Sequence, residues 1–144
     1  HYFSIHSGDS ILDAGCGPAG IFITLKGNTV DAIDPLLERY RNLPHFQPEK
    51  YAWTQFKNIP IEALDETEKY DVIFCMNAIN HVNDIEKCYD NLAKALKPNG
   101  YLIISTDAFF SIKIRFLGLT IQFEFPFDIK NQIIGNLHFT FSFT

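Results

Sequence analysis

Short apolar segments recur along the first hundred residues, and a more polar stretch separates each from the next. They predict strands at DSILDAG (9–15), NTVDAID (28–34), KYAWTQF (50–56), YDVIFCM (70–76) and YLIIST (101–106). The segment at 70–76 is a continuous apolar run, which is typical of a strand that is buried on both faces of a parallel sheet. A central parallel sheet is therefore the first expectation.

The stretches between these strands carry helix signals. Residues 18–27 and 35–43 predict short helices with a proline near each start, and residues 59–68 predict a loop or a short helix. Residues 83–100 predict the clearest helix, because apolar side chains recur there every three to four positions behind a capping polar residue. Alternating strands and helices favour right-handed crossovers between parallel strands. With the two C-terminal strands described next, we therefore expect a doubly wound, mainly parallel seven-stranded α/β sheet of the Rossmann-like class.

The C-terminal part of the chain has a different pattern. Residues 108–117 predict a short helix, whereas LTIQFEF (119–125) and LHFTFSF (137–143) alternate apolar and polar positions. A period of two is typical of antiparallel strands with one apolar face, so these segments predict an antiparallel strand pair at the C-terminal edge of the sheet. Since neither repeats nor linkers interrupt the chain, we expect residues 1–144 to form a single domain.

Composition narrows the class of protein. The 144 residues are 47% hydrophobic and 20% charged, which suits a folded domain, and 17 acidic against 12 basic residues give a net charge of −5. A nucleic-acid-binding protein usually shows a basic excess, and no apolar run reaches the length of a membrane span. The three cysteines lack metal-ligand spacing. We therefore expect a cytoplasmic protein with reduced thiols that holds no metal and binds neither nucleic acid nor a membrane.

The segment DAGCGPAG (13–20) overlaps the end of the first predicted strand and spells G-x-G-x-x-G with Gly15, Gly17 and Gly20. Glycines there allow a sharp turn and bring backbone N–H groups close to a ligand, although the same pattern also occurs in tight turns without one. Asp34 ends the second strand, where a carboxylate can accept hydrogen bonds from both hydroxyls of a ribose or can cap the next helix. The glycine-rich loop and the Asp34 carboxylate together favour a site that binds a nucleoside.

Asp13 indicates which nucleoside is bound. A carboxylate at the entrance of the loop would repel a pyrophosphate but attract an ammonium group, such as that of S-adenosylmethionine. The segments ILDAGCGPAG (11–20), YDVIFCMNAINHVND (70–84) and LKPNGYLIIST (96–106) resemble, in this order, motifs of the class I S-adenosylmethionine-dependent methyltransferases. The resemblance covers about residues 9 to 107. It implies a Rossmann-like fold, S-adenosylmethionine as cofactor and a small-molecule methyl acceptor.

The same resemblance assigns the cofactor site. Gln55 stands where the family often has an acid for the adenine amino group, and its amide oxygen can accept that hydrogen bond without a charge. Where the commonest family motif has its third glycine, this chain has Ala19 followed by Gly20. The residues expected to bind the cofactor are Asp13, Ala14, Gly15, Cys16, Gly17, Asp34, Pro35, Gln55, Phe56, Asn77 and Ala78.

Methyl transfer by in-line displacement requires mainly that donor and acceptor are aligned, so no fixed catalytic dyad is expected. His81 is a candidate general base for a hydroxyl or an activated carbon, and it could equally pack against the cofactor or cap the backbone. Phe109, Phe110 and Phe116 could line an acceptor site or pack the last helix. Because few residues precede the first strand, a lid over the acceptor could come from a second copy of the chain or from a partner chain.

Two other functions stay open at this point. A non-catalytic or partner-dependent S-adenosylmethionine-binding module of the same fold would explain the missing lid and the glutamine at position 55. An NAD-dependent oxidoreductase is favoured by G-x-G-x-x-G alone, and it is opposed by Asp13 and by the two later motifs.

Overall fold

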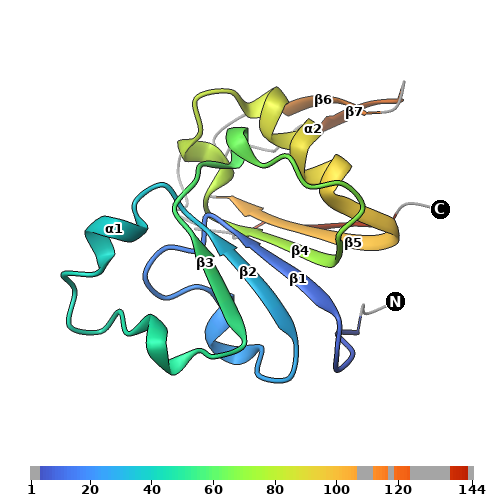
Figure 1. Cartoon of the computed structure of the whole chain (residues 1–144). Helices are drawn as coiled ribbons and strands as arrows, with labels where there is room; N and C mark the ends of the chain where they lie inside the picture. The colour runs from blue at the N-terminus through green and yellow to red at the C-terminus, as the bar shows by residue number, and fades with distance from the viewer. Residues whose placement is uncertain (1–3, 107–111, 117–118, 124–136, 143–144) are drawn as a thin grey trace, which may run out of the picture.

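Five parallel strands and one antiparallel strand form the main sheet of the computed structural model, which describes residues 4–106, 112–116, 119–123 and 137–142 (Figure 1). The strands are β1 (Ser10–Ala14), β2 (Thr29–Ile33), β3 (Thr54–Lys57), β4 (Tyr70–Met76), β5 (Leu96–Thr106) and β8 (Leu137–Ser142), and their spatial order is β3-β2-β1-β4-β5-β8. The α/β class and the parallel sheet are therefore confirmed.

The direction in which the chain adds strands reverses between β1 and β4. Ile11 of β1 lies opposite Val30 of β2 on one side and opposite Val72 of β4 on the other. In open α/β sheets a ligand crevice forms outside the carboxyl ends of the strands at such a switch point. The fold thus places the glycine loop that follows β1 beside the loop that follows β4.

Each face of the sheet packs against its own buried core. On one face, α2 (Ile85–Ala95) and the 3-10 turn η3 (Ile61–Ala63) contribute to the core, and Figure 1 shows α2 above β4 and β5. On the other face, the 3-10 turn η1 (Ile21–Thr24) and α1 (Leu37–Tyr40) pack through Phe22 and Leu37. Because both faces are covered, the apolar run of β4 is buried as predicted. Two further 3-10 turns in the described ranges are η2 (Pro48–Lys50) and η4 (Ile79–His81).

The predicted edge of the sheet is wrong in three respects. Six strands, not seven, form the main sheet within the described residues. The strand β7 (Leu119–Phe123) pairs with β6 (Ile112–Phe116) in a separate two-stranded sheet, whereas β8 alone joins the edge at β5. The helix expected over residues 108–117 is also wrong, because β6 is a strand. Isoleucines that alternate with Lys113 and Arg115 favour a strand, and the neighbouring β7 supplies a local antiparallel partner.

The first two predicted helices are shorter than expected. Residues 18–27 form only the turn η1, since the β-branched side chains of Ile21, Ile23 and Thr24 disfavour a regular α-helix. Of residues 35–43, only α1 is helical. The helix expected over residues 83–100 forms as α2, but it ends at Ala95, and β5 begins at Leu96 and not at residue 101 as expected. The Asp84 carboxylate caps α2 by accepting a hydrogen bond from Lys87 N at 3.0 Å. None of the helices in the part of the chain that the structure describes has the length and apolarity needed to cross a membrane.

Candidate functional site

The glycine loop turns back immediately after β1. The N–H groups of Gly15 and Cys16 both donate to the Ile33 carbonyl, at 2.8 and 3.1 Å, which ties the loop to the end of β2. Gly15 and Gly17 have φ values of +73° and +58°, a left-handed conformation that glycine adopts without steric cost. The two glycines thus let the loop fold tightly against the carboxyl edge of the sheet.

The two glycines differ in what surrounds them. A Cβ built on Gly15 would overlap the Ala78 side chain, so the loop after β1 is in direct contact with the loop after β4. No heavy atom of the described residues lies within 4 Å of a Cβ built on Gly17. Gly15 therefore allows close packing, whereas Gly17 exposes its backbone to open space that a ligand can enter.

Asp34 follows β2 and holds the glycine loop from the side. Its Oδ2 accepts a hydrogen bond from Gly17 N at 3.0 Å, and its Oδ1 accepts one from Leu36 N at 2.8 Å. The residue is only 7% exposed. Asp34 therefore closes the turn before α1, but it does not cap that helix as considered from the sequence, because the N-cap residue is Leu36. Each carboxylate oxygen has a second lone pair, so the group keeps capacity to accept hydrogen bonds from ribose hydroxyls.

Asp13 lies beneath the turn that follows the loop. The residue is 2% exposed, and its Oδ2 accepts a hydrogen bond from Phe22 N at 3.0 Å. Burial raises the pKa of Asp13 to about 6, although hydrogen bonds from the backbone of Phe22 and Ile21 counteract part of this effect. A Cβ on Gly20 would overlap this carboxylate. The third glycine of the motif therefore makes room for Asp13.

The loop after β4 begins with a strained residue. Asn77 has a φ of +51°, which is unusual for a residue with a side chain and is often found at functional sites. Its N–H donates to the Ser105 carbonyl at 2.8 Å, and the Ser105 hydroxyl donates to Asn77 Oδ1 at 3.3 Å. Ala78 follows against Gly15, and His81 is exposed at the end of η4. The structure thus brings Asn77 and Ala78 to the glycine loop.

Gln55 lies apart from these residues. It lies on the edge strand β3 opposite Asp31 of β2, three positions or about 10 Å before the level of Asp34. The residue at that level is Asn58, which follows β3 and whose Oδ1 accepts a hydrogen bond from Glu38 N at 3.3 Å. Asn58 was not among the predicted site residues, because the third strand was expected to end at residue 56 and it ends at Lys57.

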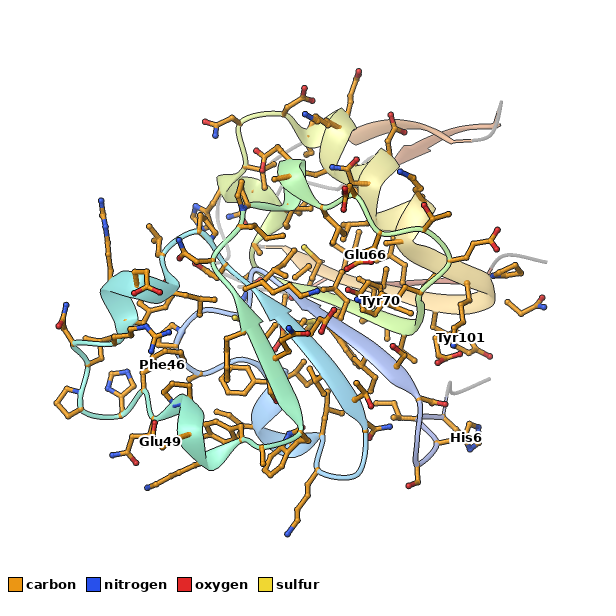
Figure 2. The ribbon with its side chains drawn as sticks, viewed as in Figure 1. His6, Phe46, Glu49, Glu66, Tyr70 and Tyr101 are labelled. Atoms are coloured by element: carbon orange, nitrogen blue, oxygen red, sulfur yellow. The ribbon has the colours of Figure 1, made fainter. Side chains whose placement is uncertain are left out.

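Phe56 is part of the apolar core. Its ring packs edge-on against Phe22, with ring centroids 5.0 Å apart, and against Phe46, at 5.5 Å. Figure 2 shows Phe46 on the same side of the molecule as α1. The side chain of Phe56 therefore supports the glycine-loop side of the sheet, and only its backbone is available at the strand edge.

Three other predicted residues reach the site mainly through their backbone. Ala14 is fully buried as the last residue of β1, and Pro35 is exposed directly after Asp34. Cys16 is buried, and burial together with the nearby carboxylates of Asp13 and Asp34 raises the pKa of its thiol. A reactive thiolate is therefore not expected in the loop. Phe109 and Phe110 lie outside the described residues, and Phe116 is the last residue of β6.

The chain is similar to curated methyltransferases. It is 36% identical over 108 residues to the ubiquinone biosynthesis O-methyltransferase of Rickettsia bellii (strain OSU 85-389), a match that covers 74% of this chain and 45% of the relative. The enzyme of the same name from Rickettsia conorii is 38% identical over 98 residues, which are 67% of this chain and 34% of the relative. The chain thus spans less than half the length of these relatives.

Solved structures share the fold. The 1,6-didemethyltoxoflavin N1-methyltransferase of Burkholderia thailandensis is 22% identical and has a TM-score of 0.58 over 68% of this chain and 44% of its own. The YcgJ protein of Bacillus subtilis is also 22% identical, with a TM-score of 0.62 over 70% of this chain and 45% of its own. The family profile described as a methyltransferase domain matches residues 1–134. The match confirms the resemblance seen in the sequence, and the chain belongs to this methyltransferase family.

Proposed function

We propose that this methyltransferase domain binds S-adenosylmethionine at the carboxyl ends of β1, β2 and β4 and transfers its methyl group to a small molecule. The observation that carries the proposal is the junction of the two loops, where Gly15 packs on Ala78 while Asp34 holds Gly17 beside open space. The backbone of the glycine loop and the Asp34 carboxylate, whose oxygens keep free lone pairs, thus meet at the switch point of the sheet. These are the groups that a ribose and an amino-acid end require.

The residues present fit this ligand from one end to the other. Asp34 accepts hydrogen bonds from the ribose, and Asn58 offers an amide at the level where the base would lie. Asn77 and the half-buried Gly17 border the amino-acid end. Asp13 acts from below the loop, because its negative charge attracts an ammonium group above pH 6 while its hydrogen bond to Phe22 keeps the loop in place. Gln55 is assigned no contact with the base in this arrangement.

Methyl transfer requires of the protein mainly that it aligns the acceptor with the methyl donor. In the transfer the bond from sulfur to the methyl carbon breaks, its electron pair stays on sulfur, and the acceptor oxygen forms the new bond to carbon. The chain must hold the acceptor in line with that bond and exclude water. If the acceptor is a hydroxyl, its proton leaves to water or to His81, whose imidazole is exposed three residues after Ala78.

A hydroxyl is the acceptor that the relatives favour, since their names describe O-methyltransferases of ubiquinone biosynthesis. Structural neighbours named as complexes with S-adenosylhomocysteine support the choice of ligand. The test is to incubate the protein with methyl-labelled S-adenosylmethionine and a panel of phenols and catechols, and to measure labelled product. Formation of a labelled ether by the wild type, and its loss in Asp34→Ala, is the expected result. Cofactor binding without product from any acceptor would instead indicate a non-catalytic module.

A further inference from the structure

The loop that follows β4, residues 77–84, carries three residues of the proposed site and is held at both ends. At its start, Asn77 N donates to the Ser105 carbonyl at 2.8 Å. At its end, Oε1 of Glu62 accepts hydrogen bonds from Asn83 N at 2.8 Å and from Asp84 N at 3.4 Å. We call residues 77–84 the post-β4 loop. A side chain from a different segment thus fixes where this loop ends.

Glu62 is itself well anchored. It lies in η3, between the buried side chains of Ile61 and Leu64. Asn91 of α2 donates through Nδ2 to the carbonyls of both Ile61 and Glu62, at 3.0 Å each. Burial would raise the pKa of Glu62, but hydrogen bonds that include those from Asn83 and Asp84 outweigh it and lower the pKa. The carboxylate therefore remains charged near neutral pH and accepts the two loop amides strongly.

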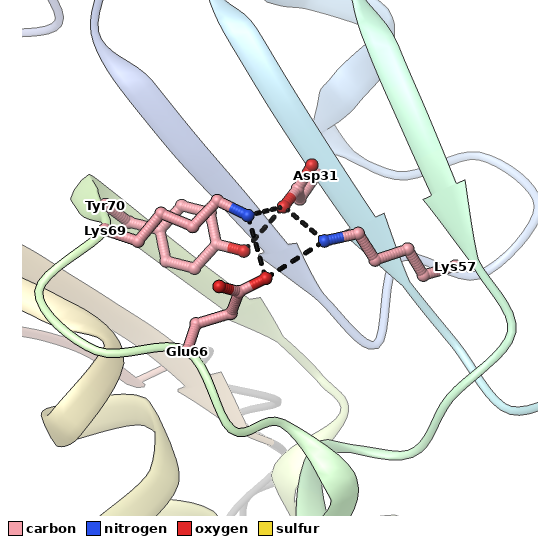
Figure 3. Close-up of polar contacts among 5 residues, drawn as sticks. All are labelled: Asp31, Lys57, Glu66, Lys69 and Tyr70. Atoms are coloured by element: carbon pink, nitrogen blue, oxygen red, sulfur yellow. Dashed lines mark hydrogen bonds and ion pairs between the residues drawn. The ribbon is translucent and has the colours of Figure 1, made fainter.

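The same segment between β3 and β4 is fixed at its far end by a second set of polar contacts (Figure 3). Oδ2 of Asp31 lies 2.7 Å from Lys57 Nζ, 2.8 Å from Lys69 Nζ and 2.7 Å from the Tyr70 hydroxyl. Oε1 of Glu66 accepts from Lys69 at 2.8 Å and from Lys57 at 3.2 Å. Figure 2 shows Glu66 and Tyr70 near the centre of the view, in front of the sheet. Because Lys57, Lys69 and Tyr70 each bond to Asp31 directly, the far end of the segment stays attached to β2 without Glu66.

We propose that Glu62 is a positioning residue that sets the post-β4 loop against the glycine loop and so determines how tightly the cofactor is held. The inference rests on the proposed function. The hydrogen bonds that Glu62 accepts from the post-β4 loop come from the backbone of Asn83 and Asp84, so it acts on the site through that backbone. If the carboxylate is removed, these amides bond to water and the end of the loop is free to move. Ala78 is then held against Gly15 only from the start of the loop, where Asn77 stays bonded to Ser105.

The test compares Glu62→Ala and Glu62→Gln with Glu66→Ala as a matched control. Glu66 is a carboxylate of the same segment, but its bonds go to Lys57 and Lys69, which lie outside the post-β4 loop. Two quantities are measured in each protein: amide hydrogen exchange across residues 77–84, and the dissociation constant for S-adenosylhomocysteine by calorimetry. Thermal unfolding of each variant shows how far general destabilisation contributes.

We expect Glu62→Ala to speed exchange at Asn83 and Asp84 and to weaken ligand binding by about three- to tenfold. Glu62→Gln keeps an acceptor oxygen and should recover part of both effects, so it also serves if the alanine variant does not fold. Glu66→Ala should leave exchange in the loop and the affinity unchanged. Equal effects from Glu66→Ala, or no effect from either Glu62 variant, would overturn the proposal. If the wild type does not bind S-adenosylhomocysteine, the proposed function fails, whereas the exchange data still decide whether Glu62 fixes the loop.

Discussion

Replacing Gly15 by alanine should destabilise the protein by about 2–5 kcal/mol, for two separable reasons. A residue with a Cβ in the left-handed conformation, here at a φ of +73°, costs about 1–2 kcal/mol. The new methyl group also overlaps the Ala78 side chain, and overpacking of a tight contact costs about 1–3 kcal/mol.

Two further variants separate these contributions. Gly17 has a φ of +58° and open space around a built Cβ, so Gly17→Ala should lose only the conformational part, about 1–2 kcal/mol. Adding Ala78→Gly to Gly15→Ala removes the overlap and should recover about 1–3 kcal/mol, after the effect of Ala78→Gly alone is subtracted in a double-mutant cycle.

The assay is urea unfolding followed by circular dichroism and by fluorescence of Trp53, the single tryptophan of the chain. Trp53 Nε1 donates to the Phe22 carbonyl at 2.9 Å, so its emission reports on the turn next to the glycine loop. Either of two results would show that overlap with Ala78 does not destabilise the protein. Gly15→Ala would lower the free energy of unfolding no more than Gly17→Ala, or Ala78→Gly would restore none of it in the Gly15→Ala background.

Two other residues give predictions of a different kind. Asp34→Asn should weaken the affinity for S-adenosylhomocysteine, measured by calorimetry, by about ten- to a hundredfold, because hydrogen bonds to a charged group are worth about 1.5–3 kcal/mol. Unchanged affinity would mean that Asp34 does not hold the ribose. Asp13 binds its proton more tightly in the folded protein, with a pKa of about 6 against 3.8, so its contribution to stability falls as the pH rises from about 4 to about 6, by about 3 kcal/mol. Unfolding free energies measured across that range should show this fall in the wild type relative to Asp13→Asn, and parallel curves would contradict it.

The elements predicted best are those whose hydrophobic pattern fits only one type of secondary structure. β4 has its predicted bounds, because an apolar run flanked by polar residues leaves no other register. The helix α2 was predicted for a similar reason, since its apolar stripe and the cap at Asp84 agree. Residues 112–116 were misread as helix, although isoleucine alternates there with lysine and arginine. In that segment the antiparallel partner β7 decides the structure.

The sequence predicted which residues lie at the edge of the sheet better than it predicted the hydrogen bonds that they make. Placing Gly15, Asp34, Asn77 and Ala78 at one edge requires only that they follow parallel strands. The hydrogen bond of Asp13 was not foreseeable, because it depends on a 3-10 turn that brings Phe22 N over the carboxylate. Gln55 was expected at the end of the third strand, but its partner in the sheet is Asp31, three positions or about 10 Å before the level of Asp34. The register between β2 and β3 decides this level, and the sequence pattern does not give that register.

Binding of S-adenosylmethionine at the carboxyl ends of β1, β2 and β4 is tested most directly by calorimetric titration of the protein with S-adenosylhomocysteine, S-adenosylmethionine and NAD. If the loops after β1, β2 and β4 form the proposed site, both sulfur compounds bind with one site per chain and NAD does not. The same titration of Asp34→Asn should show weaker binding of both sulfur compounds. Binding of NAD in the absence of binding by either sulfur compound would contradict the account.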